Sequence, residues 1–232
     1  MDGLVEERVE IGQRQLVLLR PADPAGLIDE DEFGDDEFLP YWAELWPSGL
    51  ALARHIGGLD LAGKHVLELG CGLGLPSLAA ALGGARVLAT DWAPEAVELV
   101  AQNAAANGLD VRATVLSWDS PQAARAGLFD LVLAADVLYE ERNASPLIRL
   151  LEETVAPLGG ALFADPGRRH AAAFFDGVRA AGWSIEQIVV DGLPAGGIVR
   201  LRRDETGETS SECGLPRRQR VSGQTFGEVA LD

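Results

Sequence analysis

A glycine-rich segment and an aspartate that follows it could together do chemistry. Residues 66–74 read Val-Leu-Glu-Leu-Gly-Cys-Gly-Leu-Gly, and Asp91 ends the next apolar run. The apolar start predicts a buried strand, and glycines after a strand let a ligand lie against bare backbone. The glycines of this turn are Gly70, Gly72 and Gly74. Asp91 could accept hydrogen bonds from ribose hydroxyls, although aspartate is also a common helix N-cap. The pattern predicts a site for a nucleoside cofactor.

The spacing of the glycines narrows the type of cofactor. A dinucleotide fingerprint has glycine at its first, third and sixth places, and the sixth place counted from Gly70 is Leu75. Glu68 instead belongs to a pattern that resembles class I S-adenosylmethionine-dependent methyltransferases. The helix expected over 76–82 would direct its N-terminal amides at the same site. A nicotinamide-dependent oxidoreductase built on a similar strand, turn and helix stays an alternative.

Three further segments follow predicted strands. Trp118 could stack on adenine and Asp119 could accept from its amino group, which is the favoured interpretation, although Trp118 could instead cap the core. Residues 135–139, Ala-Asp-Val-Leu-Tyr, are expected beside the methionine end of the cofactor. Residues 165–168, Asp-Pro-Gly-Arg, follow the fifth strand and also suit an ordinary turn. We expect all three at the same edge of a sheet.

From residue 65 onward, short apolar runs alternate with helical patterns, which predicts an α/β fold with a parallel sheet and helices on both faces. The predicted strands are 65–69, 86–90, 111–116, 129–135, 160–164, 183–190 and 198–202. The predicted helices are 75–82, 93–106, 144–156 and 169–181, after an amphipathic helix that ends near Gly57. The last two strands have no helix between them and should form an antiparallel hairpin at the sheet edge. Seven strands in this order resemble the Rossmann-like class I methyltransferase sheet.

The segments at the two ends of the chain have a different character. Residues 4–19 alternate apolar and polar side chains and predict a β-hairpin that precedes the main sheet. Residues 29–37 carry seven carboxylates, which favours a solvated loop but could also receive a basic partner. The last thirty or so residues lose periodicity and are predicted to be a disordered tail. We therefore expect three parts: 1–40, a methyltransferase domain over 41–203, and 204–232.

Composition restricts the partners and the cell compartment. The net charge of −17 over 232 residues opposes binding to nucleic acid, whose affinity depends on Lys and Arg. Cys71 and Cys213 lie in unlike surroundings, so a disulfide is not expected and a reducing cytoplasm is favoured. No apolar stretch approaches the roughly 18 residues of a membrane span. Scattered histidines give no expectation of a metal site, and we expect a monomer.

Four segments together identify a narrower resemblance. Residues 41–49, Tyr-Trp-Ala-Glu-Leu-Trp-Pro-Ser-Gly, the glycine turn, 135–139 and 165–168 look like the seven-strand protein-lysine methyltransferases of methyltransferase family 16. Within that family they are most similar to electron transfer flavoprotein β-subunit lysine methyltransferases. The resemblance implies that S-adenosyl-L-methionine contacts Trp46, Gly70, Gly72, Asp91, Trp118 and Ala135, with Glu68, Gly74 and Asp119 part of the same site. It also implies that the acceptor pocket contains Asp136, Tyr139 and Asp165.

The predicted activity is therefore methylation of a lysine ε-amine on a protein, such as the electron transfer flavoprotein β-subunit or a ribosomal protein. A lysine amine has a reference pKa near 10.4 and must lose a proton before it attacks. Desolvation between Trp42, Trp46 and Tyr139 would lower its pKa, whereas a carboxylate such as Asp136 would raise it. The sequence assigns no general base. The alternatives are a small-molecule N-methyltransferase for a heterocyclic amine and a cofactor-binding subunit without activity.

Overall fold

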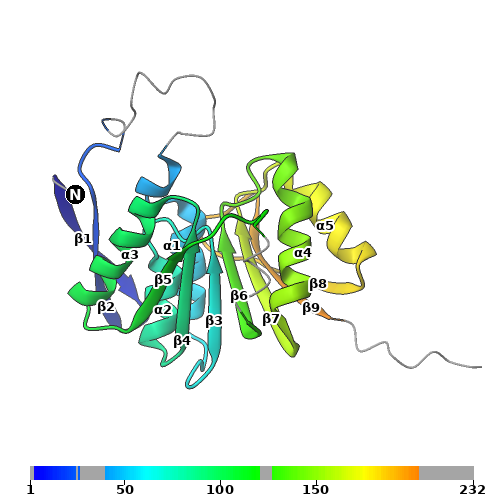
Figure 1. The fold of residues 1–232 in the computed structure, drawn as a ribbon, viewed down its shortest axis with the longest axis horizontal. Helices are drawn as coiled ribbons and strands as arrows, with labels where there is room; N and C mark the ends of the chain where they lie inside the picture. The colour runs from blue at the N-terminus through cyan, green and yellow to red at the C-terminus, as the bar shows by residue number, and fades with distance from the viewer. Residues whose placement is uncertain (1–2, 25, 27–39, 121–126, 204–232) are drawn as a thin grey trace, which may run out of the picture.

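The computed structural model describes residues 3–24, 26, 40–120 and 127–203 (Figure 1). The acidic run at 29–37 and the predicted tail from 204 onward lie outside these residues. The strands are β1 (Leu4–Ile11), β2 (Arg14–Pro21), β3 (His65–Leu69), β4 (Arg86–Asp91), β5 (Val111–Val115), β6 (Phe129–Ala135), β7 (Val155–Asp165), β8 (Trp183–Ile188) and β9 (Gly197–Arg203). The helices are α1 (Pro47–Ile56), α2 (Leu75–Leu82), α3 (Pro94–Ala106), α4 (Ala144–Thr154) and α5 (Ala171–Ala180), with a short 3-10 helix at Tyr41–Ala43. None of the helices in these ranges is long and apolar enough to cross a membrane.

Seven strands form the main sheet in the order β5-β4-β3-β6-β7-β9-β8. The first five strands in this order are parallel to one another, and β9 runs antiparallel to both β7 and β8. The chain adds β4 and β5 on one side of β3 and then returns to add β6 on the other side. The carboxyl ends of β3 and β6 therefore meet at a topological switch point, where α/β sheets bind ligands. The predicted seven-strand α/β fold is confirmed.

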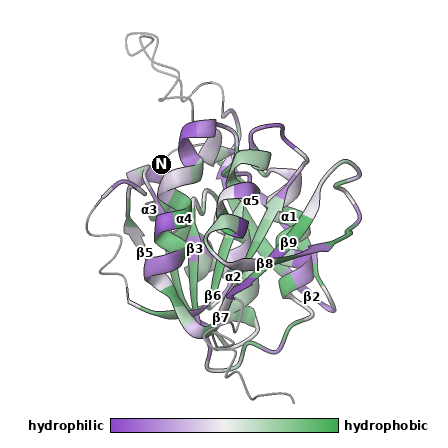
Figure 2. Cartoon of the chain, turned by 90° about the vertical axis from the view of Figure 1, so that its right-hand side faces the viewer, coloured by the Kyte–Doolittle hydropathy of each residue, from purple (hydrophilic) through white to green (hydrophobic). Residues whose placement is uncertain are grey.

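Side chains from successive residues of the central strands enter two separate cores. Val66 and Leu133 pack with α1, α2 and the hairpin, whereas Leu67 and Val132 pack with α4 and α5. This alternation follows from the two-residue period of a strand. Because both faces are covered, the central strands are largely hydrophobic (Figure 2). Figure 1 shows α4 and α5 on one side of the molecule, away from the N-terminal hairpin.

The boundary between α4 and β7 differs from the sequence prediction. A helix was expected over 144–156 and a strand over 160–164, but α4 ends at Thr154 and β7 begins at Val155. Pro157 explains the early end, because a proline disfavours helical backbone at the residue before it and donates no hydrogen bond itself. Val155 pairs instead with Phe129, and the register then shifts before Leu131. The strand is therefore longer than the apolar run that predicted it.

The predicted N-terminal hairpin is confirmed as a separate sheet of β1 and β2, and two asparagines of α3 attach it to the domain. Asn107 Oδ1 accepts from the Val17 amide at 2.8 Å, and its Nδ2 donates to the Val17 carbonyl at 2.7 Å. Asn103 makes the same pair of bonds to Leu19, at 2.6 and 3.1 Å. The two amide side chains thus replace the neighbouring strand that β2 lacks on this edge.

Candidate functional site

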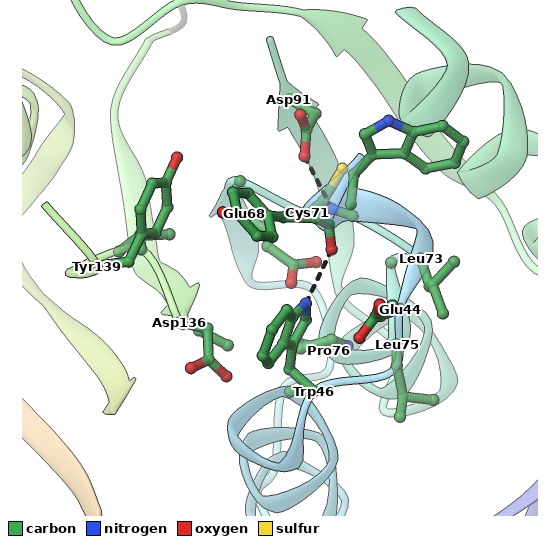
Figure 3. A pocket seen from close by; sticks show the side chains of 18 of the residues that line it. Glu44, Trp46, Glu68, Cys71, Leu73, Leu75, Pro76, Asp91, Asp136 and Tyr139 are labelled. Carbon is green, nitrogen blue, oxygen red and sulfur yellow. Dashed lines mark hydrogen bonds between the residues drawn. The ribbon is translucent and has the colours of Figure 1, made fainter. Parts of the chain in front are cut away.

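A pocket of about 600 Å³ opens at the carboxyl ends of β3, β4 and β6, where the chain order reverses (Figure 3). This volume is typical of small-molecule sites. The predicted site residues in its wall are Trp46, Glu68, Gly70, Gly72, Gly74, Asp91, Trp118, Ala135, Asp136 and Tyr139. Figure 3 shows Asp136 and Tyr139 together on one side of the pocket, apart from Asp91. We call the part around Asp91 the cofactor end and the part around Asp136 the acceptor end.

Gly70 shows why the turn after β3 needs glycine. Its φ of +65° lies in the left-handed region, and a Cβ there would lie 3.0 Å from Val137 Cγ1 and 3.2 Å from Trp118 Cζ2. The indole of Trp118 and the side chain of Val137 therefore pack directly against bare backbone. The close approach of a ligand that the sequence predicts at this turn stays a prediction.

Asp91 holds the cofactor end in shape. Its side chain is buried, Oδ2 accepts from the Gly72 amide at 2.9 Å, and Oδ1 accepts from the Ala93 amide at 3.1 Å. Burial raises the pKa of this carboxyl, while the backbone amides oppose the rise. The backbone amides of Gly72, Ala93 and Trp92 all contribute to the electrostatics of this carboxyl, and an ionised carboxylate has about four acceptor positions, so capacity for a further donor is left. Asp91 thus braces the turn, and its contact with a ribose stays a prediction.

Glu68 lies beneath the turn and stabilises the start of α2. Its Oε2 accepts from the Ser77 amide at 2.9 Å and from the Ser77 hydroxyl. Complete burial raises the pKa of Glu68 to about 8, and the bonds from Ser77 oppose this rise. Burial likewise raises the pKa of the Cys71 thiol beside it. A direct contact between Glu68 and a cofactor stays a prediction.

Asp136 begins the acceptor end with an unusual backbone. Its φ is +60°, it is the single non-glycine residue with positive φ in the described ranges, and its amide donates to Ala164 at 3.0 Å. Asn143 Nδ2 donates to the Val137 carbonyl at 3.0 Å and fixes the next turn. Arg168 donates to Asp136 Oδ1, whereas Oδ2 is buried without a hydrogen-bond partner among the described residues. Such strained positions occur where a site holds a side chain for function.

Aromatic rings enclose the acceptor end. Tyr41 lies 5.9 Å from Tyr139 and 6.3 Å from Trp46, measured between ring centroids. Trp46 Nε1 donates to the Tyr41 carbonyl at 2.8 Å, which fixes the indole against the 3-10 helix. Burial and the nearby Glu140 raise the pKa of Tyr139, so its hydroxyl stays protonated at neutral pH. The rings can remove water from an acceptor group without supplying a base.

Two predicted residues lie outside the wall of this pocket. Asp119 follows β5 by four residues, and its side chain is 79% exposed and 3.9 Å from Arg149. Asp165 ends β7 and is buried, and its Oδ1 accepts from the amides of Gly167 and Arg168. The roles predicted for Asp119 and Asp165 therefore stay predictions.

Two residues in or beside the wall had no predicted role. Arg168 lines the acceptor end and contacts Asp136, although the sequence placed it only in a turn. The sequence feature that could have predicted this role is a basic residue shortly after the carboxyl end of a strand. Asn103 donates to the carbonyl of Leu73 in the glycine turn at 3.0 Å. The sequence feature that could have predicted the role of Asn103 is a pair of asparagines four residues apart, on one face of a helix.

Comparisons with known proteins show the family of the chain. The family described as Lysine methyltransferase matches residues 41–180. An electron transfer flavoprotein β-subunit lysine methyltransferase from Rattus norvegicus is 37% identical over 139 residues, covering 56% of this chain and 51% of the relative. An EEF1A lysine methyltransferase 3 from Mus musculus is 36% identical over 139 residues, covering 57% of this chain and 60% of the relative. The chain spans about half the length of the curated relatives it matches.

Solved structures share the fold. The ribosomal protein L11 methylase from Lactobacillus delbrueckii subsp. bulgaricus has a TM-score of 0.52 and 25% identity, over 66% of this chain and 77% of that chain. The shared region contains a class I sheet of the kind that the sequence predicted. The fold is thus that of class I methyltransferases.

Proposed function

The chain belongs to the lysine methyltransferase family, and we propose that it transfers a methyl group from S-adenosyl-L-methionine to lysine ε-amines of a protein. The observation that carries this proposal is a pocket with two chemically different ends. Asp91 and the glycine turn suit a ribose and its nucleoside, and Asp136 with its unpartnered Oδ2 suits a cation. Both ends open into one cavity, as methyl transfer requires.

The cofactor would lie across the turn after β3. When bound, S-adenosyl-L-methionine supplies an electrophilic methyl group on a sulfonium. Asp91 would accept from the ribose hydroxyls, Trp118 would pack on the adenine, and the backbone at Gly70 and Gly72 would allow close approach. Ala135 would adjoin the methionine part.

At the acceptor end, the chain has to attract a lysine ammonium, orient it and exclude water. Asp136 would attract and orient the ammonium, because charge-assisted hydrogen bonds to a carboxylate are strong. Trp46, Tyr41 and Tyr139 would enclose the aliphatic part of the lysine and remove water. Positioning of this kind provides a large part of the rate enhancement in displacement reactions. The proposed role of Asp165 is to hold the turn that carries Arg168.

The proposal also includes the class of protein that carries the methylated lysine. Two matched relatives are named for lysine methylation of the electron transfer flavoprotein β-subunit and of EEF1A. A protein of this kind, or a ribosomal protein, is our proposed acceptor. We also propose a monomeric enzyme in the cytoplasm, and the free, buried thiol of Cys71 supports a reducing compartment.

The test is transfer of labelled methyl groups into a cell extract. The purified chain, the extract and cofactor with a deuterated methyl group are incubated, and mass spectrometry then locates the label. We expect label on lysine side chains of one or a few proteins, and none with the Asp91→Ala variant. Label only in the low-molecular-weight fraction would contradict the proposal and favour a small-molecule N-methyltransferase. Thermal stabilisation by NAD but not by S-adenosylhomocysteine would favour an oxidoreductase.

A further inference from the structure

Two buried carboxylates and one guanidinium form a cluster behind the acceptor end. Asp136 directly follows β6, and Asp165 is the last residue of β7. Their side chains are 9% and 5% exposed. Arg168 contacts Asp136 Oδ1, and its Nη1 lies 3.6 Å from Asp165 Oδ2. One oxygen of each carboxylate, Oδ2 in both, is buried without a hydrogen-bond partner in the described ranges. The cluster therefore carries one net negative charge and unused acceptor capacity.

The turn that carries Arg168 is fixed. Asp165 Oδ1 accepts from the amides of Gly167 and Arg168, both at 2.7 Å. Gly167 has a φ of +94°, and a Cβ there would collide with the carbonyl of Ala195 in the β8–β9 loop. The backbone of Arg168 is thus held from two sides. Its side chain extends from a rigid base toward Asp136 in the pocket wall.

The charges around the pocket are unbalanced. Its wall contains carboxyl groups from four different segments of the chain, and Arg168 is the one basic residue among the described residues that line it. The acidic residues are Glu44, Glu68, Asp91, Asp136 and Glu140. Such a wall attracts a cation, but it also favours the protonated form of an amine. An amine that stays protonated has no lone pair for attack.

We propose that Arg168 is a positioning residue that neutralises one of the two carboxylates of this cluster, so that the cluster presents one net negative charge to a bound lysine in place of two and the lysine loses its proton more readily. This inference rests on the proposed function. Acidic residues attract the lysine ammonium but also hinder the loss of its proton. Partial neutralisation by Arg168 reduces this conflict, because one carboxylate charge is enough to orient the ammonium. A guanidinium suits this role, since it stays charged at every pH at which the enzyme works.

Other titratable groups that face the acceptor have to be separated from this effect. Those that precede β6 in the chain are Tyr41 and Glu44 of the 41–46 segment, Glu68 and Cys71 of β3 and its turn, and Asp91 of β4. Those that follow β6 and β7 are Asp136, Tyr139, Glu140, Asp165 and Arg168. Glu68 has a pKa of about 8 and lies under the cofactor turn. Rates at saturating cofactor, compared between variants that differ only at Arg168 and retain all the other groups, separate the effect of Arg168 from theirs.

The first measurement is the pH profile of kcat for Arg168→Met, Arg168→Lys and the unaltered chain, with the acceptor protein identified in the extract. A removed neighbouring charge shifts a pKa by about 1 unit or more. We expect the Arg168→Met profile to move up by about one pH unit, with a roughly tenfold lower rate at pH 7 that recovers at high pH. Arg168→Lys keeps the charge and should keep the profile. A loss by the same factor at every pH would overturn the proposal.

The second measurement does not depend on turnover. n-Butylamine mimics the lysine side chain, and its binding at pH 7 is followed by calorimetry in the presence of S-adenosylhomocysteine. Because one more net negative charge holds the ammonium form, we expect Arg168→Met to bind it about tenfold more tightly. Equal or weaker binding would overturn the proposal. Arg179→Met, on the exposed side of α5, is the matched control and should match the unaltered chain.

The two proposals fail in different ways. If the unaltered chain places no label on protein lysines, the proposed function is wrong. If it does place label there and Arg168→Met shows neither the pH shift nor the tighter amine binding, only the role of Arg168 is wrong.

Discussion

The cofactor end and the acceptor end of the pocket differ in how fully their buried carboxylates are hydrogen-bonded. At the cofactor end, Asp91 accepts from two backbone amides and Glu68 accepts twice from Ser77. At the acceptor end, Asp136 Oδ2 is buried without a hydrogen-bond partner among the described residues, and behind the wall Asp165 Oδ2 has only the Arg168 guanidinium, 3.6 Å away. A buried unsatisfied polar atom costs about 1–3 kcal/mol. The acceptor end therefore keeps a cost that a bound cation would remove.

The backbone shows the same contrast. At the cofactor end, the positive φ values belong to glycines, which adopt them without strain. At the acceptor end, the positive φ belongs to Asp136, where it costs on the order of 1 kcal/mol or more. The cofactor end is thus complete before anything binds, whereas the acceptor end is strained and incomplete. This difference indicates that substrate binding, more than cofactor binding, finishes the site.

The largest effect is expected from Asp91→Ala. The change removes the brace on Gly72 and also the acceptors that we propose for two ribose hydroxyls, each worth about 1.5–3 kcal/mol as a charge-assisted bond. We expect S-adenosylhomocysteine to bind at least about 100-fold more weakly by calorimetry. Asp176→Ala is the matched control, since its carboxylate is exposed on α5 and has no predicted role in the site, and should change the affinity less than about twofold. Equal affinities for Asp91→Ala and the unaltered chain would show that the cofactor end is elsewhere.

Asp136→Asn tests the acceptor end alone. The amide has the same shape but cannot hold an ammonium by charge, so we expect kcat/KM for the acceptor protein to fall about 10- to 100-fold. The affinity for S-adenosylhomocysteine should stay within about twofold. Asp176→Asn, an exposed aspartate paired with Arg179, is the control for the substitution itself. A parallel loss of cofactor affinity would mean that the two ends are not separable.

Asn103→Ala tests the link between the hairpin and the cofactor end. Asn103 is fully buried and bonds both Leu19 of β2 and the Leu73 carbonyl of the turn, so its loss should lower the free energy of unfolding by about 1–3 kcal/mol. Asn107→Ala removes bonds to β2 but none to the turn. We expect urea unfolding to show destabilisation of both variants, with a few-fold loss of cofactor affinity only for Asn103→Ala. Equal affinities in the two variants would separate the hairpin from the cofactor end.

Much of the cofactor end was predictable from the sequence. A strand, a glycine turn and an acidic residue after the next strand are local patterns, and each of them is set by backbone preferences within a few residues. The predicted strand over 65–69 and helix over 75–82 match β3 and α2 residue for residue. Glu68 was placed correctly in the pocket wall, but its partner Ser77 was not foreseen.

The acceptor end was less predictable, because its arrangement depends on contacts between distant segments. The direction of Arg168 is set by the packing of its turn against Ala195 in a later loop. The strain at Asp136 depends on a hydrogen bond to Ala164 on the neighbouring strand. No local pattern encodes either contact. The start of β7 at Val155 was missed for the same reason, since its pairing with Phe129 is not local.

The final prediction concerns how stability depends on pH, and it tests whether the hydrogen-bonded cofactor end is free of cost. The pKa of Glu68 rises from an ordinary 4.5 to about 8 in the folded chain, mainly because of burial. The folded state then binds the proton more tightly than the unfolded state. The contribution of Glu68 to the free energy of unfolding is therefore complete below about pH 4.5 and is lost as the pH rises through 8.

In Glu68→Gln the side chain cannot ionise, so urea midpoints should fall less between pH 5 and pH 9 than in the unaltered chain. Glu98→Gln, exposed on α3, should follow the unaltered chain. If the midpoints of Glu68→Gln and the unaltered chain run parallel, the bonds from Ser77 fully offset the burial of the charge, and the contrast between the two ends is sharper than we infer.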